Sequence, residues 1–94
     1  MISKIDKKLL EACDYDYEEI AKLLVNAGAN LDTQNESGDT PLIRACYWNH
    51  LKIAELLIKK GANLDIQDKW GRTALIRACY YGHLEIVKLL KNAG

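Results

Sequence analysis

The chain has 94 residues, of which 49% are hydrophobic and 28% charged, a composition that indicates one small folded domain and excludes a disordered chain. The 13 basic side chains equal the 13 acidic ones in number, so the net charge gives no basis for binding nucleic acid. No apolar run approaches the length of about 18 residues that a membrane span needs, and the N-terminus lacks the apolar core of a secretory signal. We therefore expect neither nucleic acid nor membrane as a partner. We expect a cytoplasmic location, although a protein exported by another route would look the same.

The first part of the chain predicts two short helices. Apolar residues cluster at 9–13 and again at 20–24, and a polar loop separates the two clusters. Asp16 and Glu19 have the spacing of a capping box, in which two side chains satisfy free backbone N–H groups at the start of a helix. We therefore expect Asp16 to cap the second helix.

The next pair of helices has clearer boundaries. Thr40 is suited to the N-cap, and Pro41 to the first helical position, where its missing N–H costs nothing. This helix is expected to run to about Tyr47 and to end at Asn49, a residue that tolerates the left-handed conformation. A second helix at about 51–60 has an apolar face wider than one stripe, so more than one neighbour must cover it.

A third pair of helices follows an irregular connection. Gly61 is expected to end the preceding helix, and Asn63–Gly71 has no helical period, so it predicts an extended connection with a turn at 68–71. Thr73 repeats the N-cap without the proline, and Gly82 takes the place of the helix-ending asparagine.

The last two pairs are copies of one another. Residues 38–61 and 71–94 are identical at 14 of 24 positions, at a shift of 33 residues and without a gap. The segment Gly-Ala-Asn-Leu-Asp at 28–32 recurs at 61–65 with the same shift, and the first helices fit this frame with weaker identity. The sequence therefore predicts three units in one domain that spans 1–94, at about 1–28, 29–61 and 62–94.

A period of 33 residues with two short helices and a turn resembles the ankyrin repeat. The resemblance covers residues 7–94. It rests on Gly-Asp-Thr-Pro-Leu at 38–42, Gly-Arg-Thr-Ala-Leu at 71–75, His-Leu-Glu-Ile-Val-Lys-Leu-Leu at 83–90 and the two Gly-Ala-Asn-Leu-Asp segments. It implies an all-α solenoid of three helix–turn–helix repeats joined by β-hairpin-like loops. Ile43 and Ile76 replace the histidine of the family, so the hydrogen bonds with which that ring braces the turn should be absent.

A solenoid has to cover its two ends with polar residues. At the C-terminal end Lys91 stands where Ile58 stands one unit earlier, which indicates some adaptation to solvent. The chain also stops on the repeat glycine, which fits a fragment of a longer array equally well. The first unit is expected to act as an N-terminal cap, because Lys7, Lys8 and Glu11 replace Thr40, Pro41 and Arg44.

The recurring cysteines and histidines do not indicate chemistry. Cys13, Cys46 and Cys79 occupy one repeat position, and stacked helices about 8–10 Å apart hold such residues too far apart for a disulfide or a shared zinc ion. Each cysteine is expected to be a small buried hydrophobic residue. His50 and His83 are expected to cap or bridge loops between units. We expect no catalytic residue, no metal, no cofactor and no enzymatic activity.

Function should therefore lie on a surface. In the ankyrin family the turn tips and first helices line a concave face whose variable residues select the partner. Aromatic and arginine side chains, which dominate interface hot spots, gather there. Carried onto this sequence, the expected protein-binding residues are Arg44, Tyr47, Trp48, Lys69, Trp70, Arg72, Arg77, Tyr80 and Tyr81, with Arg44, Tyr47, Trp70, Arg77 and Tyr80 at the centre. The first unit is acidic at Asp6, Glu11 and Asp14 and the third basic at Lys69, Arg72 and Arg77, which would orient a partner of opposite gradient.

The sequence thus favours a monomeric module that binds an unidentified partner protein. The alternative is a self-associating structural unit, or a fragment of a longer array, that pairs through a C-terminal face built on Leu84, Ile86 and Leu90. Three units are near the minimum for an independently stable stack. We expect Leu57 and Ile53 to lie in its core.

Overall fold

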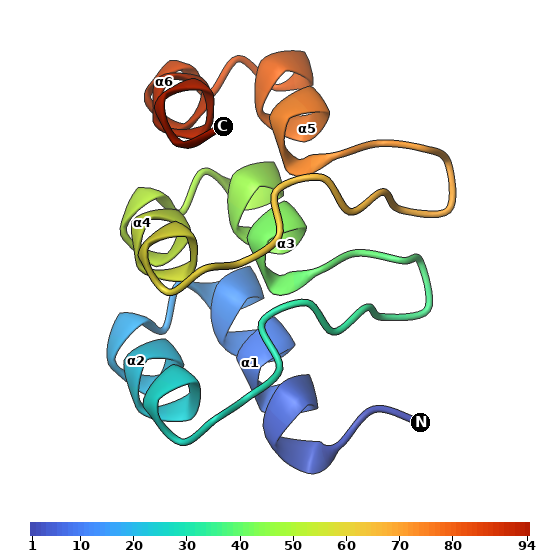
Figure 1. The fold of residues 1–94 in the computed structure, drawn as a ribbon, viewed down its shortest axis with the longest axis vertical. Helices are drawn as coiled ribbons and strands as arrows, with labels where there is room; N and C mark the ends of the chain where they lie inside the picture. The colour runs from blue at the N-terminus through green and yellow to red at the C-terminus, as the bar shows by residue number, and fades with distance from the viewer.

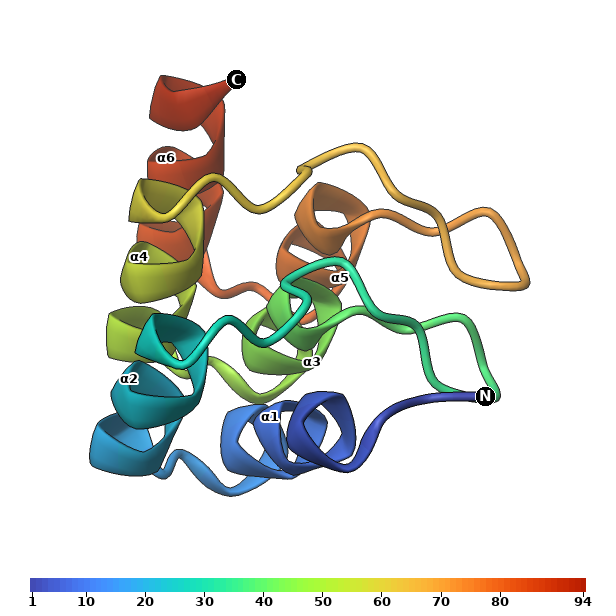
Figure 2. The same cartoon turned by 60° about the horizontal axis from the view of Figure 1, so that its bottom comes forward.

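The computed structural model describes all 94 residues and contains six α-helices and no strand. The helices are α1 (Lys4–Tyr15), α2 (Glu18–Asn26), α3 (Pro41–Trp48), α4 (Leu51–Lys59), α5 (Ala74–Tyr80) and α6 (Leu84–Ala93). Helices α1, α3 and α5 form one layer and α2, α4 and α6 a second, so that three helix pairs stack along the long axis of the molecule (Figure 1). The connections after α2 and α4 extend to one side of this stack (Figure 2). The all-α stack of helix pairs is confirmed, and none of its helices has the length and apolar character that crossing a membrane requires.

The predicted ends of the first helices in the second and third units are confirmed. The hydroxyl of Thr40 accepts a hydrogen bond from the N–H of Ile43 at 3.1 Å, and Thr73 caps α5 in the same way. Asn49 ends α3 in the left-handed conformation with φ of 64°, and Gly82 has φ of 71° after α5.

The predicted capping box in the first unit is wrong. Asp16 has φ of 60° and ends α1, where its N–H donates to the carbonyl oxygen of Ala12. Tyr17 is instead the N-cap of α2, and no side chain caps that helix. Asp16 occupies the repeat position of Asn49, so its role is to end the first helix of its unit rather than to start the second.

Side-chain amide and carboxylate oxygens brace the two long connections in place of the missing histidine. Oδ1 of Asn35 accepts the N–H of Asp39 at 3.0 Å, and Oδ1 of Asp68 accepts the N–H of Arg72 at 2.9 Å. The N–H of Asn35 donates to the carbonyl oxygen of Asp39, and the N–H of Asp68 to that of Arg72, which closes each connection as a hairpin-like turn. We call the turn at 35–39 the first hairpin and the turn at 68–72 the second hairpin.

The two hairpins lie in direct contact. The N–H of Lys69 donates to the carbonyl oxygen of Ser37 at 3.0 Å. Gly38 has φ of +82°, and a Cβ there would lie 2.9 Å from the nitrogen of Lys69. Only glycine satisfies both the left-handed conformation and this close approach of two backbones.

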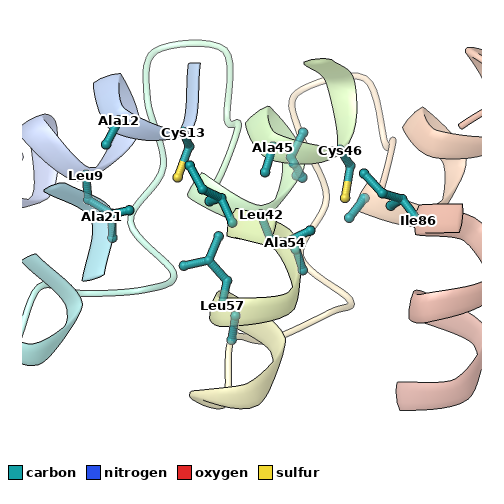
Figure 3. Packing of buried hydrophobic residues seen from close by; sticks show 14 of the residues in the cluster. Leu9, Ala12, Cys13, Ala21, Leu42, Ala45, Cys46, Ala54, Leu57 and Ile86 are labelled. Carbon is teal, nitrogen blue, oxygen red and sulfur yellow. The ribbon is translucent and has the colours of Figure 1, made fainter. Parts of the chain in front are cut away.

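The core runs through both helix layers and through all three units (Figure 3). Leu9 and Leu42 of the first layer and Ile53, Leu57 and Ile86 of the second are at most 1% exposed. The prediction that Leu57 and Ile53 lie in the core is confirmed. The core side chains come from successive units, so each unit depends on its neighbour for burial.

The three cysteines differ in environment. Cys13 and Cys46 are fully buried, as expected, and burial raises the pKa of the Cys46 thiol to about 12. The prediction is wrong for Cys79, which is exposed. Cys46 is covered by the third unit, whereas no further helix pair covers the same position in α5.

The two histidines connect successive units, as expected. Nε2 of His50 lies 3.0 Å from the carbonyl oxygen of Asp14, and Nε2 of His83 lies 3.1 Å from the carbonyl oxygen of Tyr47. Each imidazole thus satisfies a carbonyl group near the end of the preceding first helix, which would otherwise lack a partner.

Candidate functional site

Four aromatic side chains form a continuous row at the C-terminal ends of α3 and α5. The rings pack edge to face in the order Trp48, Tyr47, Tyr81 and Tyr80, with centroids 4.7, 4.9 and 4.9 Å apart. Tyr80 is 80% exposed, Trp48 49% and Tyr81 43%, whereas Tyr47 is half-buried. We call these four residues the aromatic row. It arises because two aromatic residues occupy the same positions in the second and third units.

Arg44 packs against two rings of the aromatic row. Its guanidinium carbon lies 4.9 Å from the ring centre of Tyr47 and 5.8 Å from that of Trp48. Its Nε donates to Asp14 at 2.6 Å and its Nη1 to Asp39 at 2.9 Å. Burial alone would lower the pKa of Arg44, but these hydrogen bonds raise that pKa above its ordinary value, so the guanidinium group stays positively charged. Asp14 also accepts the indole N–H of Trp48 at 3.2 Å.

Arg77 lies inside the molecule. Its side chain is 5% exposed, and its Nη2 donates to Asp39 at 3.0 Å and to Asp68 at 2.8 Å. The two carboxylates are themselves 2% and 0% exposed, and buried carboxylates of this kind require a cation close by. The repeat pattern predicts Arg77 at the centre of the binding surface, but its guanidinium N–H groups bond to two buried carboxylates rather than facing solvent.

The paired charges form a chain through all three units. Arg72 extends it at the C-terminal end, where its Nε donates to Asp68 at 2.9 Å. Burial alone would raise the pKa of Asp68, but hydrogen bonds from the backbone N–H of Arg72, the side chain of Arg77 and the N–H of Trp70 hold that pKa well below its usual range. We call this chain the buried ion network; its members are Asp14, Arg44, Asp39, Arg77, Asp68 and Arg72.

The tip of the second hairpin carries a separate pair of exposed residues, Lys69 and Trp70. Trp70 is 65% exposed, and the guanidinium carbon of Arg72 lies 5.1 Å from its ring centre. Arg72 also borders a hollow of about 250 Å³ that reaches the aromatic row. The five residues that line this hollow are Arg72, Ile76, Arg77, Tyr80 and Tyr81. The structure therefore connects the hairpin tip with Tyr80 and Tyr81.

Ile76 is not among the residues that the sequence predicts for the binding surface. This residue is 47% exposed, although Ile43 at the same repeat position is 1% exposed. The period alone predicts the same burial for both. Ile43 is buried because the third unit packs on α3, whereas no helix pair of the structure packs on the opposite side of α5.

The expected charge gradient is weaker than the sequence indicates. Asp14 and Arg77 are paired within the buried ion network, and Asp6 accepts the N–H of Asn30 at 2.8 Å. Exposed Glu11 in the first unit and Glu36 in the first hairpin make no ion pair and line a larger hollow of about 700 Å³ between the N-terminal arm, α1 and the first hairpin. At the other end Lys69 is exposed and Arg72 keeps 41% of its side chain exposed.

No three histidine, cysteine, aspartate or glutamate side chains lie close enough together to hold a metal ion. The exposed chemistry near the aromatic row consists of aromatic faces and edges, phenol hydroxyls and cationic groups. Such a surface can contact apolar side chains, accept and donate hydrogen bonds, and attract carboxylates.

A family model of ankyrin repeats, in three copies, matches residues 9–94 of the chain. No curated protein matches the chain.

Proposed function

The chain belongs to the ankyrin repeat family, whose members are generally protein–protein interaction modules, and we propose that it binds a partner protein through the aromatic row and the tip of the second hairpin. The observation that carries this proposal is the exposure of three linked rings across two repeats. Tyr80, at 80% exposed, contributes little to the core. Tyrosine, tryptophan and arginine are the residue types that dominate the energetics of protein interfaces.

The aromatic row is held in place before any partner arrives. Each ring contacts the next one, Arg44 lies over the ring of Trp48, and Asp14 accepts the indole N–H of Trp48. Side chains that are already ordered lose less conformational entropy on binding, so more of the contact energy remains as affinity. Tyrosine and tryptophan favour this effect, because they present a large area with only two rotatable side-chain bonds.

The charges around the surface suggest the chemistry of the partner. Lys69 and Arg72 stand at one end, and Glu11 and Glu36 stand at the other. We infer a partner segment that has apolar side chains opposite the rings and acidic residues toward the second hairpin. Charges at the rim mainly set the orientation and the rate of association rather than the affinity.

We infer that the module acts without an enzymatic reaction of its own and in the cytoplasm. The ankyrin repeat family is a family of non-enzymatic interaction modules. The three cysteines are free thiols, which is usual for proteins in a reducing compartment.

Alanine variants of the aromatic row test this function. A partner is first captured on the wild-type chain from an extract of the source cells, identified by mass spectrometry and purified. We expect at least one of Trp48→Ala, Tyr80→Ala and Tyr81→Ala to weaken its binding by about 30-fold or more, the size of a hot-spot effect. Isothermal titration calorimetry measures the affinities, and far-UV circular dichroism checks that the helices persist.

Tyr17→Ala is the matched control. Tyr17 is 51% exposed, and its ring packs on Tyr15 and on none of the four rings of the aromatic row, so its removal should leave the affinity unchanged. Binding by all three row variants at the strength of the control would contradict the proposed function.

A further inference from the structure

The outer face of the third unit exposes apolar side chains that the repeat would normally cover. Ile76 is 47% exposed, Leu84 is 69% exposed and Cys79 is exposed. One repeat earlier, Ile43 and Cys46 are at most 1% exposed, because the third unit packs on them. We call the surface formed by Ile76, Cys79, Tyr80, Leu84 and Val87 the end face.

The composition of the end face differs from the sequence-based alternative. That alternative built a self-associating face on Leu84, Ile86 and Leu90. Leu84 is exposed, but Ile86 is 0% and Leu90 4% exposed, because both pack into the core. The prediction is therefore wrong for Ile86 and Leu90, which are directed toward the preceding unit.

The hollow beside the end face has a filled counterpart within the molecule. Its lining residues Arg72, Ile76, Arg77, Tyr80 and Tyr81 correspond, one repeat earlier, to Asp39, Ile43, Arg44, Tyr47 and Trp48. At that earlier position Arg77 of the next unit occupies the site, with Nη2 3.0 Å from Asp39 and its guanidinium carbon 5.4 Å from the ring centre of Tyr47. The hollow is thus the place where a following repeat would insert the residue that corresponds to Arg77.

The charge in the hollow is reversed relative to the filled site. Arg72 replaces Asp39, so the hollow favours an acidic side chain where the filled site holds an arginine. The residue that corresponds to Arg77 in the first unit is Glu11, which is exposed and makes no ion pair. The chain therefore carries both halves of a complementary pair, one on α1 and one beside α5, and these two helices lie at opposite ends of the first layer (Figure 1).

We propose that a second copy of this chain stacks its first unit on the end face and places its Glu11 in the hollow beside Arg72. The apolar residues agree with this register. Ile20 and Leu23 of α2 are 47% and 69% exposed, and the residues at the same repeat position in α4, Ile53 and Leu56, are buried and half-buried. In the second copy these two side chains take the place that Ile53 and Leu56 take within the molecule.

This contact joins two different surfaces, so it does not close on itself. Each added copy leaves a free end face and a free first unit, and head-to-tail growth can continue. Lys8 is expected to weaken this contact between the two copies. The same repeat position is Ala74 in the third unit, which is 1% exposed, so stacking forces the Lys8 ammonium group to turn away from the contact.

Sedimentation analysis of the full chain over a wide range of concentration tests the proposal. We expect the weight-average mass to rise with concentration beyond that of a dimer. Glu11→Arg should lower the association constant by about a hundredfold or more, because it places like charges together. Lys8→Ala should raise the mass at equal concentration. Arg72→Glu should act like Glu11→Arg, and an equimolar mixture of these two variants should associate again, because every contact between them then pairs opposite charges.

A chemical readout locates the contact. Cys79 lies on the end face, so its rate of alkylation should fall as the wild-type concentration rises and stay constant in Glu11→Arg. Circular dichroism verifies the fold, and because Glu11 is exposed, Glu11→Arg carries the charge test if Arg72→Glu unfolds through its lost bond to Asp68. A monomer at every concentration, in the wild type and in Lys8→Ala alike, would overturn the proposal. A mass that levels off at the dimer would also overturn it, because it indicates a closed contact.

Discussion

Replacement of Arg77 by methionine is expected to lower the free energy of unfolding by about 3–5 kcal/mol, because it leaves two buried carboxylates with one fewer cation. Asp39 is 2% exposed and Asp68 0%, and both bond to Arg77 in the native structure. Methionine keeps most of the length of the side chain, so the loss reports on the charge rather than on a cavity. Urea denaturation at neutral pH measures the change.

Arg72→Met is the matched control for this variant. Arg72 bonds to the same carboxylate of Asp68, but 41% of its side chain is exposed, and a pair of this kind contributes about 0–1 kcal/mol. Equal losses of stability in the two variants would show that burial does not determine the effect.

The pH dependence gives a second readout of the same network. The pKa of Asp68 in the folded protein lies below its ordinary value of 3.8, so its contribution to stability is complete above that value and is lost as the pH falls through the folded pKa. Arg77→Met removes part of the cause of this low pKa. The loss of stability in acid should therefore be smaller in the variant than in the wild type.

Replacement of Leu57 by alanine is expected to destabilise the chain by about 2–5 kcal/mol through the lost burial and the cavity that remains. Leu57 is 0% exposed and lies in α4, the second-layer helix of the middle unit, which packs against helices of both neighbouring units. Such a loss removes much of the stability that a small domain possesses. Thermal and urea denaturation of dilute samples should both detect it.

Leu23→Ala makes the same chemical change on α2, where the side chain is 69% exposed. Its effect should lie within about 0.5 kcal/mol, as for most surface substitutions. If the Leu57 variant unfolds with the wild-type midpoint, the assignment of the core is incorrect.

The repeat pattern was sufficient to predict the architecture, because the signals for helix starts and ends are local. Thr40 and Pro41 start α3 with their own atoms, and Asn49 ends it with its own backbone conformation. The capping-box prediction for Asp16 is wrong because it also relied on a local signal. The acidic residue satisfies the spacing of a capping box, but its repeat position belongs to the end of α1.

The environment of a side chain was predictable only where both neighbouring units are present. Cys79 repeats Cys46, and Ile76 repeats Ile43, yet both residues of the third unit are exposed. In a stack, burial is supplied by the next unit along, so the last unit differs from the others without any change in its own sequence.

Arg77 illustrates a second limit. The segment Leu-Ile-Arg-Ala-Cys-Tyr is identical around Arg44 and Arg77, but the two side chains are 19% and 5% exposed. The burial of Arg77 depends on Asp39 and Asp68, which lie on the two hairpins and converge only in the folded chain. No local pattern reports that convergence. It leaves the aromatic row, rather than the arginines, as the centre of the surface that we propose for binding.

Photo-crosslinking tests this location most directly. A photoreactive phenylalanine analogue replaces Tyr81 in one variant and Lys59, an exposed residue at the far end of α4, in another. With the captured partner present, we predict crosslinks from position 81 and none above background from position 59. Crosslinks from position 59 and none from position 81 would contradict binding at the aromatic row.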